Sequence, residues 1–149
     1  MKYNNHIYEI IHAKIDPWIM QCPHKTKDEI FIDMLRDMDN NITFPLEKDD
    51  MVFYMMPETP WLAKLNVFSD TKNAKQALTS AIYLTDYMFE NMKTLRKIYG
   101  ISPHKKFVRM INKIGWKQEG VLSESFLDKN GDMVDQYVFG VTRDEFKLR

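Results

Sequence analysis

All five glycines of this 149-residue chain lie in its last third, and the first 99 residues contain none. Glycine adopts backbone conformations that other residues avoid, so it marks turns and places where a backbone is approached closely. The distribution predicts tight turns between short elements from Gly100 onward. It also predicts that any anion-binding loop earlier in the chain is built without glycine, although backbones approach anions most closely at that residue.

The composition is that of one globular domain. Hydrophobic residues make up 44% of the chain and charged residues 28%, which is ordinary for such domains. We see no repeat, low-complexity stretch or linker, so we expect a single domain over residues 1–149. No apolar run approaches the ~18 residues of a membrane span, and the N-terminal segment lacks the apolar core of a signal peptide. The single cysteine, Cys22, is typical of a reducing compartment, so we expect a cytoplasmic protein.

The charge balance limits the partners. The formal net charge is zero at pH 7, which argues against broad capture of nucleic acid, because that needs a surplus of lysine and arginine. We therefore expect neither nucleic acid nor a membrane as a partner. Lys105, Arg109 and Lys113 follow one another at intervals of four residues and predict a charged helix face. Such a face is usually solvated, and its functional alternative is a phosphate-binding surface.

The first half of the chain predicts helices followed by strands. Residues 1–25 leave helix and strand open. Thr26 and Glu29 form the capping-box pattern, which predicts a helix to about Asp39. The extended segments ITFPL and MVFYMM flank the charged turn EKDD and predict a hairpin, and WLAKLNVF predicts a third strand.

The second half predicts alternating strands and helices. Residues 72–92 are expected to form a long helix with Ser69, Asp70 or Thr71 as its N-cap. Its apolar positions recur at spacings of three and four residues: Ala74, Ala77, Leu78, Ala81, Ile82, Met88, Phe89 and Met92.

Glycines punctuate the elements that follow this long helix. LRKIYGIS predicts a strand, and a helix opens at Ser102-Pro103 and stops at Gly115. Two further strands are expected to be joined by a two-residue turn at Asn130-Gly131, and Thr142 with Glu145 predicts a last capped turn.

From Val67 onward, this series of strand, long helix, strand, short helix and two-stranded hairpin resembles the Gcn5-related N-acetyltransferase (GNAT) superfamily. The segments IGWKQEGVL and NGDMVDQYVFGVTRDEF carry the resemblance, and the earlier residues fit by layout. The resemblance implies an α/β (α+β) fold with a mixed, mostly antiparallel central sheet and helices on both faces. It also implies acetyl-CoA as the cofactor of an active member.

The resemblance also implies which residues meet that cofactor. In the superfamily a glycine-rich loop before the long helix holds the cofactor, and here that position reads KNAKQA. Lys75 stands where a glycine is expected. The implied cofactor-binding residues are Lys72, Lys75, Gln76 and Ala77, with His104 in place of an asparagine that contacts the cofactor.

The catalytic tyrosine of the superfamily is missing. Its position falls on Ile111, whose side chain cannot donate a proton. No catalytic residue is therefore assigned. If the protein is active, the candidate general bases are the carboxylates of Glu58, Asp70 and Glu124.

Two functions follow from this pattern. The altered positions Lys75, His104 and Ile111 favour a non-catalytic structural or interaction protein that has lost its cofactor. It would resemble degenerate GNAT-like proteins of tailed bacteriophages, some of which are internal virion or head-assembly proteins. Its partners would be virion components or a second copy, in the virion or the host cytoplasm. The alternative is an acetyl-CoA-dependent N-acetyltransferase acting on a primary amine, with Lys72 and Lys75 replacing backbone contacts to the cofactor.

Two motifs that suggest metal binding fail on spacing. The stretch from Asp128 to Asp132 places glycine at the fourth position of a calcium loop, where the sixth is required, so it predicts a hairpin turn. Cys22-Pro23-His24, with His6 and His12 upstream, has no paired ligand spacing. The sequence therefore predicts no metal site.

Overall fold

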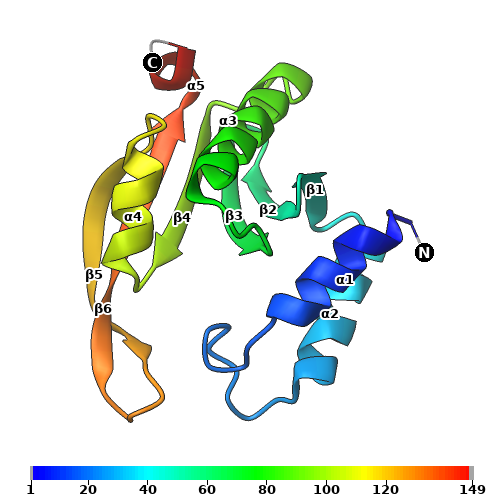
Figure 1. The fold of residues 1–149 in the computed structure, drawn as a ribbon, viewed down its shortest axis with the longest axis vertical. Helices are drawn as coiled ribbons and strands as arrows, with labels where there is room; N and C mark the ends of the chain where they lie inside the picture. The colour runs from blue at the N-terminus through cyan, green and yellow to red at the C-terminus, as the bar shows by residue number, and fades with distance from the viewer. Residues whose placement is uncertain (1, 148–149) are drawn as a thin grey trace.

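The structure is a computed structural model that describes residues 2–147. Within these residues, six strands form one sheet in the order β1-β2-β3-β4-β6-β5, and only the pair β3 and β4 is parallel. This arrangement confirms the expected mixed, mostly antiparallel sheet with helices (Figure 1). In the described part of the chain, no helix is long and apolar enough to cross a membrane. The elements are α1 (Asn5–Lys14), α2 (Lys27–Asp39), β1 (Phe44–Lys48), β2 (Met51–Thr59), β3 (Leu62–Ser69), α3 (Ala74–Asn91), β4 (Lys97–Ser102), α4 (Lys105–Asn112), β5 (Lys117–Leu127), β6 (Met133–Thr142) and α5 (Arg143–Lys147).

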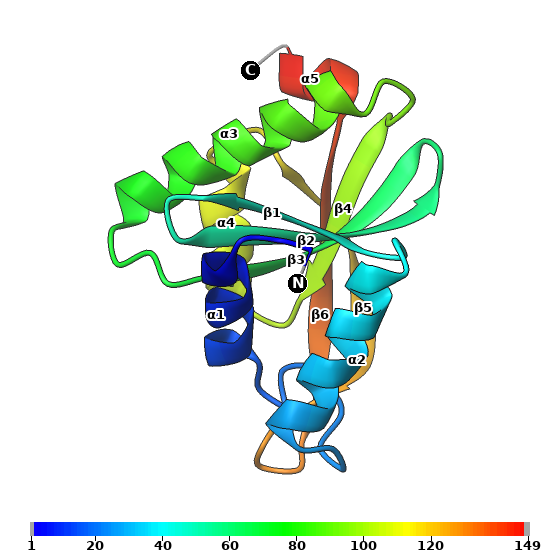
Figure 2. The same ribbon diagram turned by 90° about the vertical axis from the view of Figure 1, so that its right-hand side faces the viewer.

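The two faces of the sheet carry separate cores. Residues of α3, α4 and α5 pack on one face, whereas α1 and α2 pack on the other face over β2 and β3. Figure 2 is viewed from the side of α1 and α2 and shows both helices in front of the sheet. Strand β2 serves both cores, because Phe53 belongs to the first and Val52 and Tyr54 to the second. Successive side chains of a strand point to opposite faces. The unbroken apolar run MVFYMM therefore reflects a strand that is covered on both sides.

The N-terminal segment, whose structure the sequence left open, is the helix α1. Its N-cap is Asn4, whose side chain accepts a hydrogen bond from the backbone N–H of His6 at 2.8 Å. The predicted capping box of Thr26 and Glu29 is confirmed at the start of α2. Asn41, with a φ of 58°, follows the C-cap of α2, and asparagine tolerates this left-handed conformation better than most residues.

The β1–β2 and β5–β6 hairpins differ in their turns. Between β1 and β2, Asp49 and Asp50 both have positive φ, at 47° and 68°, which is the geometry of a tight two-residue hairpin turn. The two-residue turn predicted at Asn130-Gly131 is wrong, because β5 and β6 are joined by the five residues between Leu127 and Met133. The carboxylate of Asp128 accepts the backbone N–H groups of Asn130 and Asp132, and this local bonding favours the longer loop.

The C-terminal end of the chain is tied to α3. Arg143 donates side-chain hydrogen bonds to the backbone carbonyls of Phe89, Met92 and Leu95, where the C-terminal end of a helix attracts a cation. The predicted capped turn is confirmed, because Thr142 and Glu145 exchange hydrogen bonds. Arg143 thereby positions α5 and the end of β6 against the first core.

Candidate functional site

The sheet opens between its two parallel strands. β3 and β4 pair over three residues only, from Leu62 opposite Lys97 to Lys64 opposite Tyr99. Beyond these pairs the strands diverge, as Figure 1 shows, and each leads to a helix. The N-termini of α3 and α4 therefore follow the two open strand ends. Ligands of open sheets commonly bind outside the carboxyl ends of parallel strands that separate in this way.

The predicted cofactor residues lie on both sides of this opening. Lys72, Lys75 and Gln76 are exposed at the start of α3, and Ala77 is partly buried against the first core. His104 is the exposed N-cap of α4. The structure thus brings the first four residues together at one helix end. No hydrogen bond or ion pair within residues 2–147 joins His104 to them.

The N-cap of α3 is Asn73, and the predicted caps Ser69, Asp70 and Thr71 are wrong. The side-chain oxygen of Asn73 accepts the backbone N–H groups of Lys75 at 2.9 Å and Gln76 at 3.2 Å. Asp70 is directed elsewhere, because its carboxylate lies 3.2 Å from Lys14 Nζ and its N–H donates to the carbonyl of Asp50. Tertiary contacts therefore move the cap two or more residues along the chain. Ala74, which the helical pattern placed among the apolar positions, is exposed in the first turn.

This change alters the electrostatics at the start of α3. A capping aspartate would repel a phosphate, whereas the amide of Asn73 is neutral. The charge of Asp70 is balanced by Lys14. In the part of the chain that the structure describes, Lys72 and Lys75 form no ion pair. Two free cations thus flank a helix end that is itself a positive pole.

The start of α4 offers a second set of donors. His104 makes no side-chain cap hydrogen bond to this helix, so its first backbone N–H groups remain open to an anion. The helix carries the exposed cations Lys105 and Arg109, and Lys105 Nζ lies 5.6 Å from the ring centre of Tyr137. Among the described residues, Arg109 and Lys113 form no ion pair. The phosphate-binding alternative for this face is therefore compatible with the structure.

The space between α3 and α4 is narrow. An apolar cavity of about 10 Å³ lies there, which is room for about one water molecule. Ile111, at the position of the superfamily's tyrosine, is buried beside this cavity. Its lining also includes the long, flexible side chain of Met110, and methionine repacks at low cost. A wider channel here would require Met110 or Phe107 to move.

The three candidate bases have different surroundings. Glu58 accepts a hydrogen bond from the hydroxyl of Tyr99. Asp70 is paired with Lys14. Glu124 has a positive φ of 47° in an irregular part of β5, and its N–H donates to Asp135. Of the three, Glu58 is therefore the carboxylate that is bonded to Tyr99, the last β4 residue paired with β3 before the opening.

Tyr99 is a site residue that sequence reasoning missed. It is the last β4 residue paired with β3, and it lies on the face opposite to its neighbour Ile98, which belongs to the first core. Burial and the hydrogen bond to Glu58 raise the pKa of Tyr99 to about 12. Its partner Glu58 is 41 residues away in the chain, so no local pattern signals the pair.

Comparisons with known proteins identify the fold. No protein-family model and no curated protein matches the chain. A chimera of spermidine N-acetyltransferase SpeG from Vibrio cholerae and hSSAT aligns over 99% of this chain and 97% of its own, with a TM-score of 0.74 and 19% identity. The Vibrio cholerae spermidine N-acetyltransferase in complex with CoA and spermine aligns over 96% and 88%, with a TM-score of 0.69 and 18% identity.

A third solved structure gives the same result. The GNAT-family acetyltransferase from Bacillus anthracis aligns over 97% of this chain and 93% of its own, with a TM-score of 0.68 and 18% identity. At such identities the likeness concerns the fold. The alignments extend over almost the whole chain, including the residues before Val67 that the sequence matched only by layout. The chain therefore has the GNAT fold.

Proposed function

We propose that the protein is an acetyl-CoA-dependent N-acetyltransferase that acts on a primary amine. The observation that carries the proposal is the opening between β3 and β4, where the N-termini of α3 and α4 meet unpaired lysines. The three solved structures compared above are acetyltransferases, and one of them is a complex with CoA. These neighbours support the catalytic alternative over the structural one.

The residues at the opening suit a ligand rich in phosphate. Asn73 occupies the N–H groups of Lys75 and Gln76, but a neutral amide can rotate away without leaving a charge behind. The cations of Lys72 and Lys75 then replace the close backbone contact that a glycine would allow. The uncapped start of α4 adds further donors.

The protein's own chemistry is proton removal and positioning. Acetyl-CoA would supply the activated acetyl thioester. An amine is cationic in neutral water and must lose a proton before it can act as a nucleophile. The carboxylate of Glu58, held by the Tyr99 hydroxyl, is placed to accept that proton directly or through water. Because the pKa of Tyr99 is raised to about 12, its hydroxyl stays protonated and keeps its role as a donor to Glu58.

A second candidate function is the non-catalytic structural or interaction protein. It is favoured by the cap of Asn73 on the α3 donors and by the small volume of the cavity between α3 and α4, about 10 Å³. A role in a phage virion and assembly with virion components stay predictions. The apolar MVFYMM segment offers no surface for a second copy, because its first five residues are buried in the sheet.

Calorimetric titration with acetyl-CoA separates the two functions. The enzyme proposal predicts saturable binding with a micromolar dissociation constant, and absence of binding favours the structural protein. Lys75→Glu should weaken binding by at least about tenfold, because a cation next to phosphate is replaced by an anion. Lys93→Glu is the matched control, since Lys93 is exposed just beyond the other end of α3. Equal affinities of the two variants would contradict the placement of the cofactor.

An activity assay then tests the base. Release of free thiol is measured with acetyl-CoA and spermidine, the amine in the names of the SpeG structures, and with other primary amines. Glu58→Gln should lower kcat by about 10²-fold or more while leaving the affinity for acetyl-CoA unchanged. Tyr99→Phe should give a smaller loss, because the carboxylate remains. Unchanged kcat in Glu58→Gln would exclude Glu58 as the base.

A further inference from the structure

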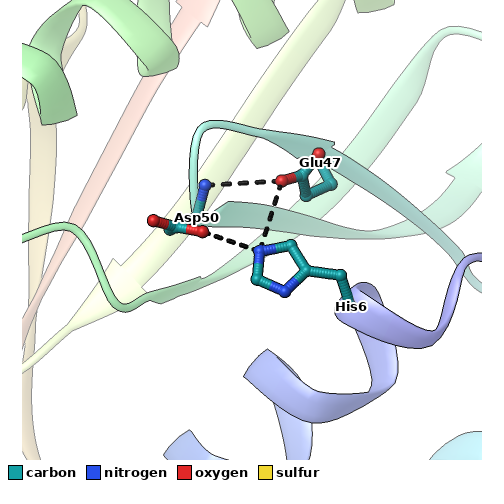
Figure 3. A group of neighbouring side chains, drawn as sticks. All are labelled: His6, Glu47 and Asp50. Carbon is teal, nitrogen blue, oxygen red and sulfur yellow. Dashed lines mark hydrogen bonds and ion pairs between the residues drawn. The ribbon is translucent and has the colours of Figure 1, made fainter.

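Three side chains from separate elements converge at the end of the β1–β2 hairpin (Figure 3). His6 lies in the first turn of α1, Glu47 on β1 and Asp50 in the turn between β1 and β2. His6 Nε2 lies 2.6 Å from Asp50 Oδ1 and 3.8 Å from Glu47 Oε1. Ligand atoms of all three residues lie within 4.8 Å of one another. Both carboxylates thus face the same ring nitrogen.

These separations fit the coordination shell of a metal ion. Bonds of about 2.1 Å place neighbouring ligand atoms about 3 Å apart in an octahedral shell and about 3.4 Å apart in a tetrahedral one. The observed 2.6 and 3.8 Å bracket those values, so small rotations of Glu47 and Asp50 would seat an ion. One imidazole nitrogen with two carboxylate oxygens suits a first-row transition metal, whereas calcium and magnesium prefer oxygen alone.

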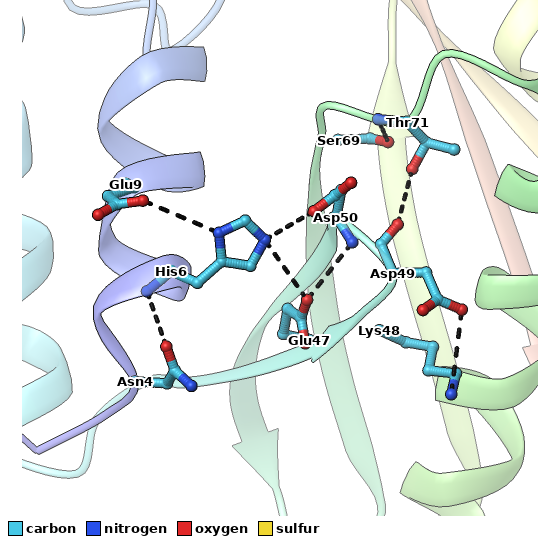
Figure 4. Close-up of polar contacts among 9 residues, drawn as sticks. All are labelled: Asn4, His6, Glu9, Glu47, Lys48, Asp49, Asp50, Ser69 and Thr71. Carbon is cyan, nitrogen blue, oxygen red and sulfur yellow. Dashed lines mark hydrogen bonds and ion pairs between the residues drawn. The ribbon is translucent and has the colours of Figure 1, made fainter.

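The charges around the three residues also call for a cation. Glu9 Oε2 lies 3.9 Å from the other ring nitrogen of His6, which adds a third carboxylate. Within residues 2–147, none of the carboxylates of Glu9, Glu47 and Asp50 forms an ion pair with lysine or arginine. The nearby Lys48 pairs with Asp49 (Figure 4). Three negative groups therefore share one imidazole, and a divalent ion would balance them.

The backbone holds the ligands independently of any ion. The N–H of His6 is bonded to its cap Asn4, and the N–H of Asp50 donates to Glu47 Oε1 at 3.4 Å. The left-handed φ values of Asp49 and Asp50 fix the turn. The backbone segments that carry His6 and Asp50 thus start from fixed positions, which lowers the entropy that binding would otherwise cost.

We propose that His6, Glu47 and Asp50 bind a divalent transition-metal ion such as Zn²⁺, with water completing its shell. The sequence predicted no metal site because it grouped His6 with Cys22 and His24. In the fold His6 instead meets carboxylates 41 and 44 residues further along the chain. No spacing pattern of metal motifs covers such a set.

The position of the site gives the ion a structural consequence. The carbonyl of Asp50 accepts the N–H of Asp70 at 2.9 Å, and the carbonyl of Asp49 accepts the hydroxyl of Thr71 at 3.2 Å; Figure 4 shows the contact between Thr71 and Asp49. An ion at His6 therefore links α1 to the turn that holds the segment entering α3. This inference does not depend on whether the protein binds acetyl-CoA.

Calorimetric titration of the full chain with Zn²⁺, without acetyl-CoA, tests the site. The titration is done at about pH 8, where a typical imidazole is neutral. One saturable site is expected. His6→Ala should weaken binding at least about tenfold, because even second-shell changes at metal sites cost that much. The matched control is His12→Ala. His12 Nε2 lies 2.9 Å from a single carboxylate, that of Asp28, with an exposure of 44% against 45% for His6, so this variant should bind Zn²⁺ like the wild type.

A second variant keeps the test decisive if His6→Ala does not fold. Asp50→Asn preserves the shape of the side chain and tolerates the left-handed turn, and circular dichroism checks its fold. It too should lose at least about tenfold in affinity. The proposal is overturned if the wild type shows no saturable binding of Zn²⁺. It is also overturned if a folded His6→Ala or Asp50→Asn variant binds Zn²⁺ as tightly as the wild type.

Discussion

Strand β4 makes two unequal seams with its neighbours in the sheet. With β6 it pairs along its full length, from Lys97 opposite Thr142 to Ser102 opposite Tyr137. With β3 it pairs only from Lys97 to Tyr99, and beyond Tyr99 the two strands separate. The sheet is thus closed on one side of β4 and open on the other, and both helices that flank the candidate site begin on the open side.

The difference shows that the opening is bordered on one side by the tightly packed pair of β4 and β6. On the closed side, Gly100 lies against the ring of Phe139, and that ring packs on Phe107 and Trp116. Gly140 lies on the other face of the same seam, where an added Cβ would stand 3.0 Å from the carbonyl of Ile98. Gly100 and Gly140 therefore serve close packing next to the site.

Among the substitutions considered, Phe139→Ala should weaken the packing between β4 and β6 the most. Phe139 is 3% exposed and contacts two other aromatic rings, so its truncation leaves a large cavity. The free energy of unfolding should fall by about 3–5 kcal/mol, measured by urea denaturation. Val121→Ala is the control, because Val121 is 47% exposed on β5 and should change stability by less than about 0.5 kcal/mol. A loss below about 1 kcal/mol in Phe139→Ala would mean that the ring does not anchor this seam.

A smaller loss is expected when the same contact is overfilled. In Gly100→Ala the new Cβ would lie 2.6 and 2.8 Å from ring carbons of Phe139 and 3.2 Å from the carbonyl of Leu65. The ring is buried and cannot swing away, so the variant should lose about 1–3 kcal/mol of stability. Gly120→Ala, which meets nothing within 4 Å, serves as the control in the same denaturation experiment. If the two alanine variants were equally stable, the close approach at Gly100 would be unimportant.

The sequence predicted features that rest on local patterns better than the contacts that form the opening. The capped turn of Thr142 with Glu145, at the end of β6, joins residues three apart and is confirmed. The capping box of Thr26 with Glu29 at the start of α2, away from the opening, is equally local and is also confirmed. The order of strands and helices follows from apolar periodicity in the same way. Such patterns involve residues that are close together in the sequence, so a single sequence displays them.

The open region depends on contacts that cross the chain. Asp70 gives up the N-cap of α3 because Lys14 and the Asp49–Asp50 turn hold it. Tyr99 gains a role only because β4 brings it to Glu58. The separation of β3 from β4 is likewise a matter of register, and residues of the two strands lie at least 28 positions apart in the sequence. None of these relations leaves a trace in residue spacing.

The substitution Asn73→Asp tests whether the backbone N–H groups at the start of α3 bind the cofactor's phosphates. The new carboxylate keeps the cap on Lys75 and Gln76 and interacts favourably with the helix dipole, so stability should change by less than about 1 kcal/mol. Under the proposed function, affinity for acetyl-CoA should fall about tenfold, or about 1.4 kcal/mol, because the cap is now an anion. Calorimetry measures the affinity, and Asn73→Gly, which removes the cap without adding charge, should bind acetyl-CoA at least as well as the wild type. An affinity that Asn73→Asp leaves unchanged would place the phosphates elsewhere.

The smallest effect concerns the end of the closed seam, where Glu145 caps α5 beside the last residue of β6. The ion pair with Lys117, at 2.6 Å, and hydrogen bonds with Thr142 lower the pKa of Glu145 from 4.5 to about 2. A lowered folded-state pKa means that the stabilisation is fully present above the unfolded value near 4.5 and is lost as the pH falls toward 2.

The expected result is a pH-dependent difference between the wild type and Glu145→Gln. Above about pH 5 the wild type should be more stable by a few tenths to about 1 kcal/mol, since the carboxylate is partly exposed and its ion pair is screened by solvent. Toward about pH 2 the two free energies of unfolding should converge, because Glu145 becomes protonated in the folded wild type. Glu90→Gln, an exposed carboxylate of α3 without an ion pair among residues 2–147, should follow the wild-type pH profile. A stability difference in Glu145→Gln that stayed constant from neutral pH into acid would show that the cap acts through hydrogen bonding alone and that the charge of Glu145 contributes nothing to closing this end of the seam.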